Sequence, residues 1–321
     1  MKIQSYFFHL LLCGAVLIGT GATAMAEPGP ATRSAALKPE QTPQFLRFVD
    51  DGHGGGKLEA ALVTYRNRRG VTVHLVSALH VAEPSFYAGL EKTFRTYDVL
   101  LYEMIKPKGA PPPRPGQKST STVSMIQRFL KDTLKLDFQL DDIDYSQANF
   151  VNADLDYETF SKLQSERGES IVGIMIQSML REWTKEMTGE DNGKASQMTL
   201  FDLLAALKAP DRPRQLKLLM AKQFDDIEDQ MSGLTGPNGS VIITERNKAA
   251  IAEVKQQIEE GKKNIGLFYG AGHMRDMEER LLALGFHRTG IEWRVGWDMT
   301  EKAAPATAPA TRPALPDFPM P

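Results

Sequence analysis

The sequence of 321 residues contains a single cysteine, Cys13. It lies in an apolar run, residues 6–19, which follows Lys2 and precedes the Ala-Met-Ala of residues 24–26. This pattern predicts a secretory signal over residues 1–26, cleaved before Glu27. The remaining chain has no cysteine, so we expect an exported protein without disulfides. A cysteine nucleophile is excluded, and any metal must be bound by His, Asp or Glu.

The sequence also lacks a strong charge of one sign and a long apolar segment. Its formal net charge is -2, which argues against nucleic acid as the main partner because such proteins need a basic surface. The apolar run of residues 6–19 is shorter than the roughly 20 residues that cross a bilayer. We therefore expect no stable membrane span after signal cleavage, and a periplasmic or extracellular location.

Two polar segments flank the part of the chain that is expected to fold. Residues 27–44 form a Pro-rich leader and residues 300–321 a Pro/Ala-rich tail, and both have the low-complexity composition typical of disorder. Residues 45–299 are predicted to form one domain. Its beginning and end alternate strand and helix patterns, whereas residues 118–261 have the periodicity of helices.

Two stretches of this domain share one pattern. "VTVHLVSALHV", residues 71–81, and "KNIGLFYGAGHM", residues 263–274, each contain an apolar strand, a small residue and then a histidine three positions later. Aligning His80 with His273 places Ser77 on Gly270. The sequence therefore predicts an α/β fold, with two pseudo-repeated halves forming a central mixed sheet and residues 118–261 as a large helical insertion that covers it.

The two strand-end histidines are the first candidates for chemistry. Ligands in open α/β sheets bind beyond the carboxyl ends of the strands, where His80 and His273 are expected to lie. A single histidine at such a place is more often a hydrogen-bonded structural residue, but the matched pair favours a functional interpretation. In contrast, His74 is interpreted as a satisfied histidine of the sheet, and His53 and His287 as incidental.

A glutamate ends the next apolar strand, "YDVLLYEMI", residues 97–105. A carboxylate at the end of a buried strand is costly unless it is paired or bound to a cation. Glu103 could form a salt bridge at the strand end, for instance with Lys106. Alternatively, His80, Glu103 and His273 would form a two-histidine, one-carboxylate set, which suits a divalent metal such as Mn, Fe, Co or Zn and leaves positions open for water and substrate.

The polar stretch "TERN", residues 244–247, interrupts a predicted helix. Asn247 falls on the apolar stripe of that helix, where a polar group needs a partner. Glu245 could simply pair with Lys248 on the helix surface. In the functional interpretation, Arg246 and Asn247 orient substrate or carboxylates, and Glu245 is a general base or a further ligand.

These motifs together resemble the TraB/PrgY/GumN family, which includes the TIKI metalloproteases. "YGAGHM" and "TERN" are the most specific pieces, the resemblance covers roughly residues 45–297, and Ser77 departs from the glycine of the family's first motif. The resemblance implies two related αβ halves around a central sheet and metal-dependent peptide cleavage that favours Mn or Co. It assigns metal ligation to His80, Glu103 and His273, and supporting roles to Glu245, Arg246 and Asn247.

We therefore expect an exported metal-dependent hydrolase, a TIKI-like peptidase acting on a peptide or protein substrate. Glu245 would be its base, Arg246 would stabilise developing negative charge, and Asn247 would orient the substrate. One alternative is a non-catalytic metal- or haem-binding protein, with an apolar cleft formed by residues 171–180 and 199–206. Another is an interaction module whose helices present methionines to a partner. These methionines are Met175, Met179, Met187 and Met198.

Overall fold

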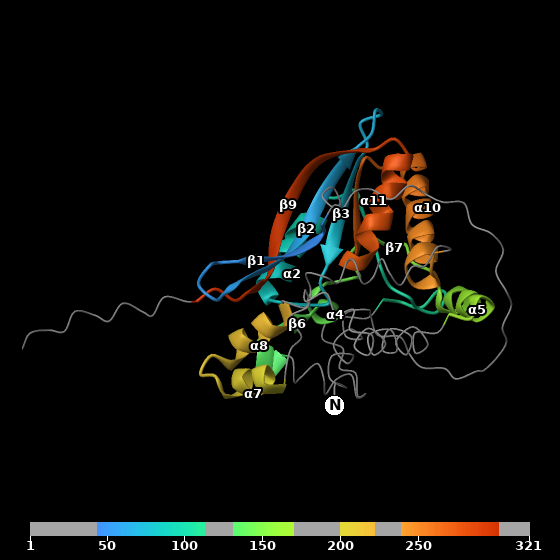
Figure 1. The fold of residues 1–321 in the computed structure, drawn as a ribbon. Helices are drawn as coiled ribbons and strands as arrows, with labels where there is room; N and C mark the ends of the chain where they lie inside the picture. Colours follow the sequence, from blue (N-terminus) through green and yellow to red (C-terminus); the bar gives the residue numbers. More distant parts are fainter. Residues whose placement is uncertain (1–43, 113–130, 170–199, 222–238, 302–321) are drawn as a thin grey trace, which may run out of the picture.

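The computed structural model describes residues 44–112, 131–169, 200–221 and 239–301 (Figure 1). The predicted signal and nearly all of the leader and tail lie outside these residues. So do residues 171–180 of the predicted haem cleft and the four methionines of the predicted partner surface.

A seven-stranded mixed sheet forms the centre of the described residues. The strands pair in the order β1-β2-β3-β8-β5-β7, and β9 pairs with β2 along nearly its whole length. The pairs β3–β8, β8–β5 and β5–β7 are parallel, whereas β1, β3 and β9 run antiparallel to β2. The strands are β1 (Leu46–Asp50), β2 (Gly56–Arg66), β3 (Thr72–Ala78), β5 (Val99–Tyr102), β7 (Phe150–Asn152), β8 (Asn264–Gly270) and β9 (His287–Asp298).

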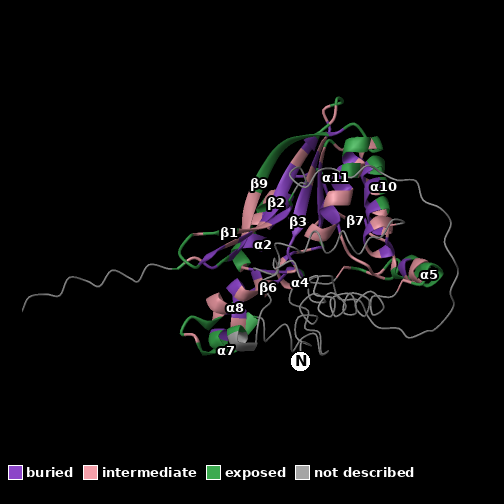
Figure 2. Ribbon diagram, viewed as in Figure 1, coloured by how far each residue is buried: buried purple, intermediate pink, exposed green. Residues whose placement is uncertain are grey.

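Helices cover both faces of this sheet, and they explain why its central strands are apolar throughout. In β3, Leu75 belongs to a core cluster with α10 (Arg246–Glu259) and α11 (Met274–Ala283), which lie side by side in Figure 1. The next residue, Val76, belongs to the cluster on the other face, with α2 (Pro84–Phe94). Figure 2 shows the buried positions concentrated in the central strands and on the inner sides of these helices.

The remaining elements are short. A two-stranded ladder pairs β4 (Val81–Ala82) with β6 (Asp137–Phe138), and α4 (Gln139–Asp142) follows it directly. Ahead of α10, residues 241–245 form a π-helical turn. None of the helices in the described ranges is both long and apolar enough to cross a membrane. The other described elements are α5 (Tyr157–Arg167), α7 (Leu200–Lys208), α8 (Arg212–Ala221) and the 3₁₀ turn Ala271–His273.

The α/β class and the central mixed sheet are confirmed. The unit of strand, small residue, histidine and helix occurs twice, in β3 to α2 and in β8 to α11. The halves then differ in strand pairing, because β5, which follows α2, pairs with the parallel strand β8, whereas β9, which follows α11, pairs with the antiparallel strand β2. The boundary of the helical insertion also needs correction. β7 and α10 lie within residues 118–261, yet β7 is a strand of the central sheet and α10 packs on its face.

Candidate functional site

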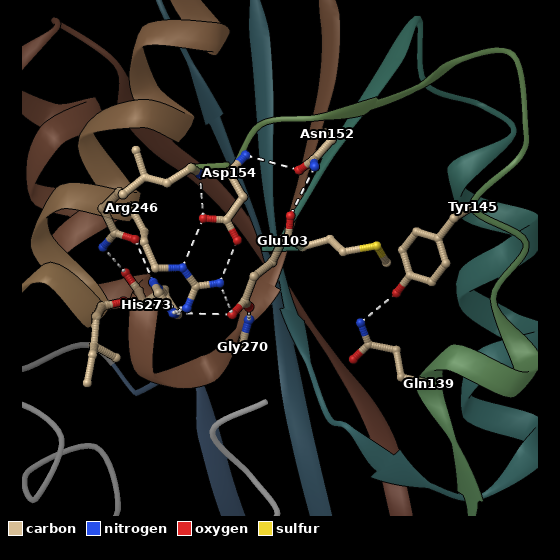
Figure 3. Close-up of polar contacts among 12 residues, drawn as sticks. Glu103, Gln139, Tyr145, Asn152, Asp154, Arg246, Gly270 and His273 are labelled. Carbon is tan, nitrogen blue, oxygen red and sulfur yellow. Dashed lines mark hydrogen bonds and ion pairs between the residues drawn. The ribbon is translucent and has the colours of Figure 1, made fainter. Parts of the chain in front are cut away.

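Four neighbouring parallel strands deliver polar side chains to one edge of the sheet. Glu103 follows β5 directly, His80 and Asp154 each come two residues after β3 and β7, and His273 comes three residues after β8. Because the four strands are parallel, all of these residues lie beyond carboxyl ends, where α/β sheets bind their ligands. Figure 3 shows Glu103, Asp154 and His273 gathered around the side chain of Arg246, which enters from α10.

Gly270 lies at the point where the predicted metal ligands converge. Its backbone N–H donates to Glu103 Oε2 over 2.7 Å. A Cβ atom placed on this glycine would lie 3.4 Å from Glu103 Oε2, 3.8 Å from His80 Nε2 and 3.9 Å from His273 Cδ2. Any longer side chain would project between these three groups, so the small residue of the motif keeps the space between them free.

The His273 ring is held in one orientation by Asn247. The Asn247 amide nitrogen donates to His273 O over 3.0 Å and to Asp276 Oδ2 over 2.7 Å, and both of these atoms are acceptors. Asn247 Oδ1, 2.7 Å from His273 Nδ1, must therefore accept a proton from that nitrogen. In the neutral ring the lone pair is then on Nε2, which lies 3.5 Å from Glu103 Oε1. Ligand histidines are commonly fixed in this way by a second residue.

Arg246 joins the two carboxylates of the site. Its Nε and Nη2 donate to the two oxygens of Asp154 over 2.9 and 2.6 Å, and Nη2 also donates to Glu103 Oε1 over 2.7 Å. Burial alone would raise the pKa of Glu103, but the adjacent guanidinium of Arg246 opposes burial most strongly, and that pKa lies well below its ordinary value. Glu103 is therefore ionised at neutral pH. The alternative prediction of a salt bridge at this strand end is confirmed, but the partner is Arg246 and not Lys106, whose Nζ donates to Ala110 O.

The charges of this cluster do not balance. Two carboxylates, those of Glu103 and Asp154, face one guanidinium, and their side chains are only 10% and 0% exposed. Burial lowers the pKa of His80, with Glu103 opposing the shift, so its ring is neutral at neutral pH and adds no positive charge. An uncompensated buried charge is strongly unfavourable. The site therefore accommodates one further positive charge, which a bound cation or a proton on His273 would supply.

The donor set fits a divalent cation in chemistry, whereas Arg246 limits where that cation would bind. Within the described ranges, no three His, Asp or Glu side chains already form a metal cage. Arg246 Nη1 lies 3.4 Å from His273 Nε2, and Nη2 occupies Glu103 Oε1. A cation would therefore have to bind on the other side of the Glu103 carboxylate, around Oε2 and towards His80 Nε2. Ligation by all three residues would require Arg246 to give up its long contact with His273.

The other predicted site residues have mixed outcomes. Asn247 is buried and bonded to His273, as its place on the apolar stripe indicates. Glu245 instead pairs with Arg167 and, over 2.9 Å, with Lys248. The helix-surface interpretation of Glu245 is therefore confirmed, and its contacts among the described residues give no support to a role as general base.

The interpretations of the remaining histidines agree with the structure. His74 is bonded to Thr64 Oγ1 over 3.0 Å and to Asn264 Oδ1 over 2.9 Å, and it stacks on Tyr97. The prediction that His74 is a structural residue of the sheet, with both ring nitrogens hydrogen-bonded, is thus confirmed. His53 and His287 are exposed.

Three polar residues of the site were missed from the sequence. Asp154 follows "FVN", an apolar run too short to identify as a strand, and this position after a strand is the only signal that could have revealed it. Gln139 and Tyr145 form a buried pair, with Gln139 Nε2 donating to the Tyr145 hydroxyl over 2.7 Å. Figure 3 draws this pair on the opposite side of Glu103 from Arg246.

Comparison of the chain with protein-family models, curated proteins and solved structures found no match.

Proposed function

We propose that the protein is an exported metal-dependent hydrolase whose metal is bound by His80, Glu103 and His273. The observation that carries this proposal is the convergence of these three side chains around Gly270, in a buried cluster where two carboxylates share one arginine. Neutral imidazole and carboxylate donors suit Mn, Co, Zn and Fe. A divalent metal at such a site lowers the pKa of water and polarises a carbonyl group.

The chain's own residues position this chemistry. Asn247 keeps the lone pair of His273 on Nε2, and Asp154 holds the guanidinium of Arg246 at two of its nitrogens. Among the described residues, the third nitrogen, Nη1, makes only long contacts of 3.4 and 3.5 Å, to His273 Nε2 and Ile242 O. Nη1 is therefore the donor that Arg246 can offer to negative charge developing on a substrate oxygen.

The substrate class and the family are part of the same proposal. "YGAGHM" and "TERN" resemble the TraB/PrgY/GumN family, and Gly270, Arg246, Asn247 and His273 of these motifs all lie in the site. This clustering supports membership, a peptide or protein substrate, and Mn or Co ahead of Zn or Fe. The haem-binding alternative has no comparable contact among the described residues.

Metal binding tests the proposal directly. The chain from Glu27 to Pro321, dialysed against chelator, is titrated with Mn, Co and Zn by calorimetry beside the double variant His80→Ala/His273→Ala. We expect one metal ion per chain, lost in this variant. The matched control is His53→Ala/His287→Ala, which removes two exposed histidines and should bind metal normally. Equal binding in both double variants, with folding intact, would refute the site.

A peptide-library digest tests the reaction with a second matched pair. Glu103→Gln removes a proposed ligand, whereas Glu245→Gln changes a carboxylate whose described contacts are ion pairs with Arg167 and Lys248. We expect metal-dependent cleavage by the wild type, its loss in Glu103→Gln and its retention in Glu245→Gln. A metal-loaded wild type that cleaves no peptide would restrict the proposal to metal binding.

A further inference from the structure

The two strand-end histidines differ in how their rings are held. His273 has a complete partner in Asn247. The His80 ring has no comparable completed hydrogen bond to any residue that the structure describes. Nevertheless its Nε2 is placed near Gly270, on the side of Glu103 Oε2 that Arg246 leaves free. A ligand histidine that could rotate or change tautomer would bind metal weakly, so His80 needs a partner of its own.

The fold places Gln139 beside His80 for a structural reason. β4 begins directly after His80 and β6 ends directly before Gln139, and the two strands pair antiparallel with Val81 opposite Phe138. The ladder continues by one bond, from the backbone N–H of Gln139 to His80 O, over 3.0 Å. The side-chain amide also lies near the ring: burial lowers the pKa of His80, Glu103 opposes this shift most, and Gln139 adds the smallest opposing contribution.

One polar atom of the Gln139 side chain has no partner within the described ranges. The residue is 5% exposed, and its Oε1 has no hydrogen-bond partner among the described residues. Its Nε2 is held by the Tyr145 hydroxyl. Burial, with a smaller contribution from the charge of Glu103, raises the pKa of Tyr145, so the hydroxyl stays protonated and its oxygen accepts from Nε2. The amide is thereby oriented so that Gln139 Oε1 is a buried acceptor without a donor among the described residues. Buried acceptors in folded proteins nearly always have a hydrogen-bond donor.

We propose that Gln139 is the positioning residue of His80, with Gln139 Oε1 accepting the proton on His80 Nδ1 so that Nε2 keeps its lone pair toward Gly270. Gln139 would then do for His80 what Asn247 does for His273. In each case the oxygen of a side-chain amide selects the tautomer, and a further polar group, Tyr145 or Asp276, orients that amide. The consequence for metal binding rests on the proposed function, whereas the tautomer does not.

Nitrogen NMR of the metal-free protein reads the tautomer. Long-range ¹H–¹⁵N spectra at about pH 8, above the ordinary pKa of histidine, distinguish protonated from unprotonated ring nitrogens. The His80 signals are assigned by their loss in His80→Ala. We expect Nδ1 to carry the proton in the wild type and in Gln139→Glu, which keeps an acceptor. Gln139→Met removes the acceptor and should give a mixture of tautomers, while the His273 signals stay unchanged as an internal control.

Manganese titration of the same proteins measures what the orientation contributes. Loss of a residue that orients a metal ligand typically weakens binding by about 10–100-fold, which is the effect expected for Gln139→Met. Gln139→Glu should restore most of the affinity. Tyr145→Phe removes the oxygen that holds Gln139 Nε2 and should give an intermediate loss, which provides a second variant if Gln139→Met is poorly folded by circular dichroism.

The outcomes separate this proposal from the proposed function. A proton on His80 Nε2 in the wild type would mean that the amide is turned the other way, and it would overturn the positioning role. So would a His80 tautomer that is the same in Gln139→Met as in the wild type. If the tautomer changes as expected but the wild type binds no manganese, the positioning role stands and the metal site is refuted.

Discussion

Two arginine–carboxylate clusters lie at opposite ends of strand β3. At its carboxyl end, Arg246 bridges Glu103 and Asp154. At its amino end, where Tyr65 of β2 pairs with Val73, Arg288 binds Glu278 of α11 through two nitrogens, over 2.7 and 3.0 Å. The Tyr65 hydroxyl donates to the same Glu278 oxygen over 2.7 Å. Both clusters thus bury a carboxylate that accepts from an arginine and from one neutral donor.

The clusters differ in charge and in what they leave unbonded. The Arg288 cluster has one carboxylate for one guanidinium, so it is balanced and complete. The Arg246 cluster has two carboxylates for one guanidinium, and next to it Gln139 Oε1 and the Tyr269 hydroxyl have no partner among the described residues. A balanced cluster stabilises the fold and needs nothing more, whereas buried polar groups left over are typical of sites that bind something.

Replacing the arginine of the unbalanced cluster should have the largest effect. Arg246→Met leaves two buried carboxylates without a cation, and breaking a buried ion pair in this way typically costs about 3–5 kcal/mol in unfolding free energy. Urea denaturation in chelator measures this loss. Added manganese should reduce it, because a bound cation offsets the same charge.

The balanced cluster supplies the control for this prediction. Arg288→Met also removes an arginine from a carboxylate, but the Arg288 side chain is 35% exposed and water can reach the group. We expect a smaller loss of stability that manganese does not change. If the two variants are equally destabilised and equally indifferent to manganese, the contrast in charge between the two ends of β3 has no functional meaning.

The strand ends of the site could be predicted because they follow long apolar runs. β3 and β8 each have seven residues, so the positions of His80 and His273 could be inferred from where the runs stop. β7 has only three half-buried residues and lies in a region with helical periodicity, so its strand, and Asp154 after it, could not be recognised. Gln139 was missed for a similar reason, since α4 has only four residues.

The ion pairs of Arg246 with Glu103 and Asp154 could not be predicted from the sequence either, because they depend on the rotation of α10 about its axis. Adjacent residues of a helix point about 100° apart, so only some of "TERN" can face the sheet. Arg246 and Asn247 are buried on the same face as Ala250, Ile251 and Val254, which lie about one and two turns further along the helix. Glu245 lies at the edge of this face. The sequence places Asn247 on the stripe, but a long charged side chain such as Arg246 is assigned to the surface by default.

Neutralising one carboxylate at each end of β3 sharpens the comparison. Glu278→Gln keeps the shape of the side chain but removes the charge that Arg288 and Tyr65 share, which should cost about 1–3 kcal/mol of unfolding free energy. Its manganese affinity should remain that of the wild type. Glu103→Gln should instead lose manganese binding. Calorimetric titration measures the manganese affinity of both variants, and urea denaturation measures their unfolding free energy. A loss of metal binding in Glu278→Gln would contradict the assignment of function to the carboxyl end of β3 alone.

The smallest expected effect tests whether the buried Tyr65 hydroxyl is closed to water. Tyr65→Phe removes one hydrogen bond to Glu278 and should cost about 0.5–1.5 kcal/mol at neutral pH. Burial, followed by Glu278, raises the pKa of Tyr65 above its ordinary value, so the folded state favours the protonated hydroxyl. A raised folded-state pKa gives stability that is present below the unfolded pKa of about 10 and is lost as pH rises beyond it.

The gap in unfolding free energy between the wild type and Tyr65→Phe should therefore narrow above about pH 10, because only the wild type loses this contribution. Urea denaturation at a series of alkaline pH values measures the gap, and Tyr157→Phe, at an exposed tyrosine, should show none. A gap that stays constant would mean that Tyr65 ionises as readily in the folded as in the unfolded chain. Solvent would then reach the bond between Tyr65 and Glu278, and the contrast between a closed, balanced cluster and the Arg246 cluster would no longer hold.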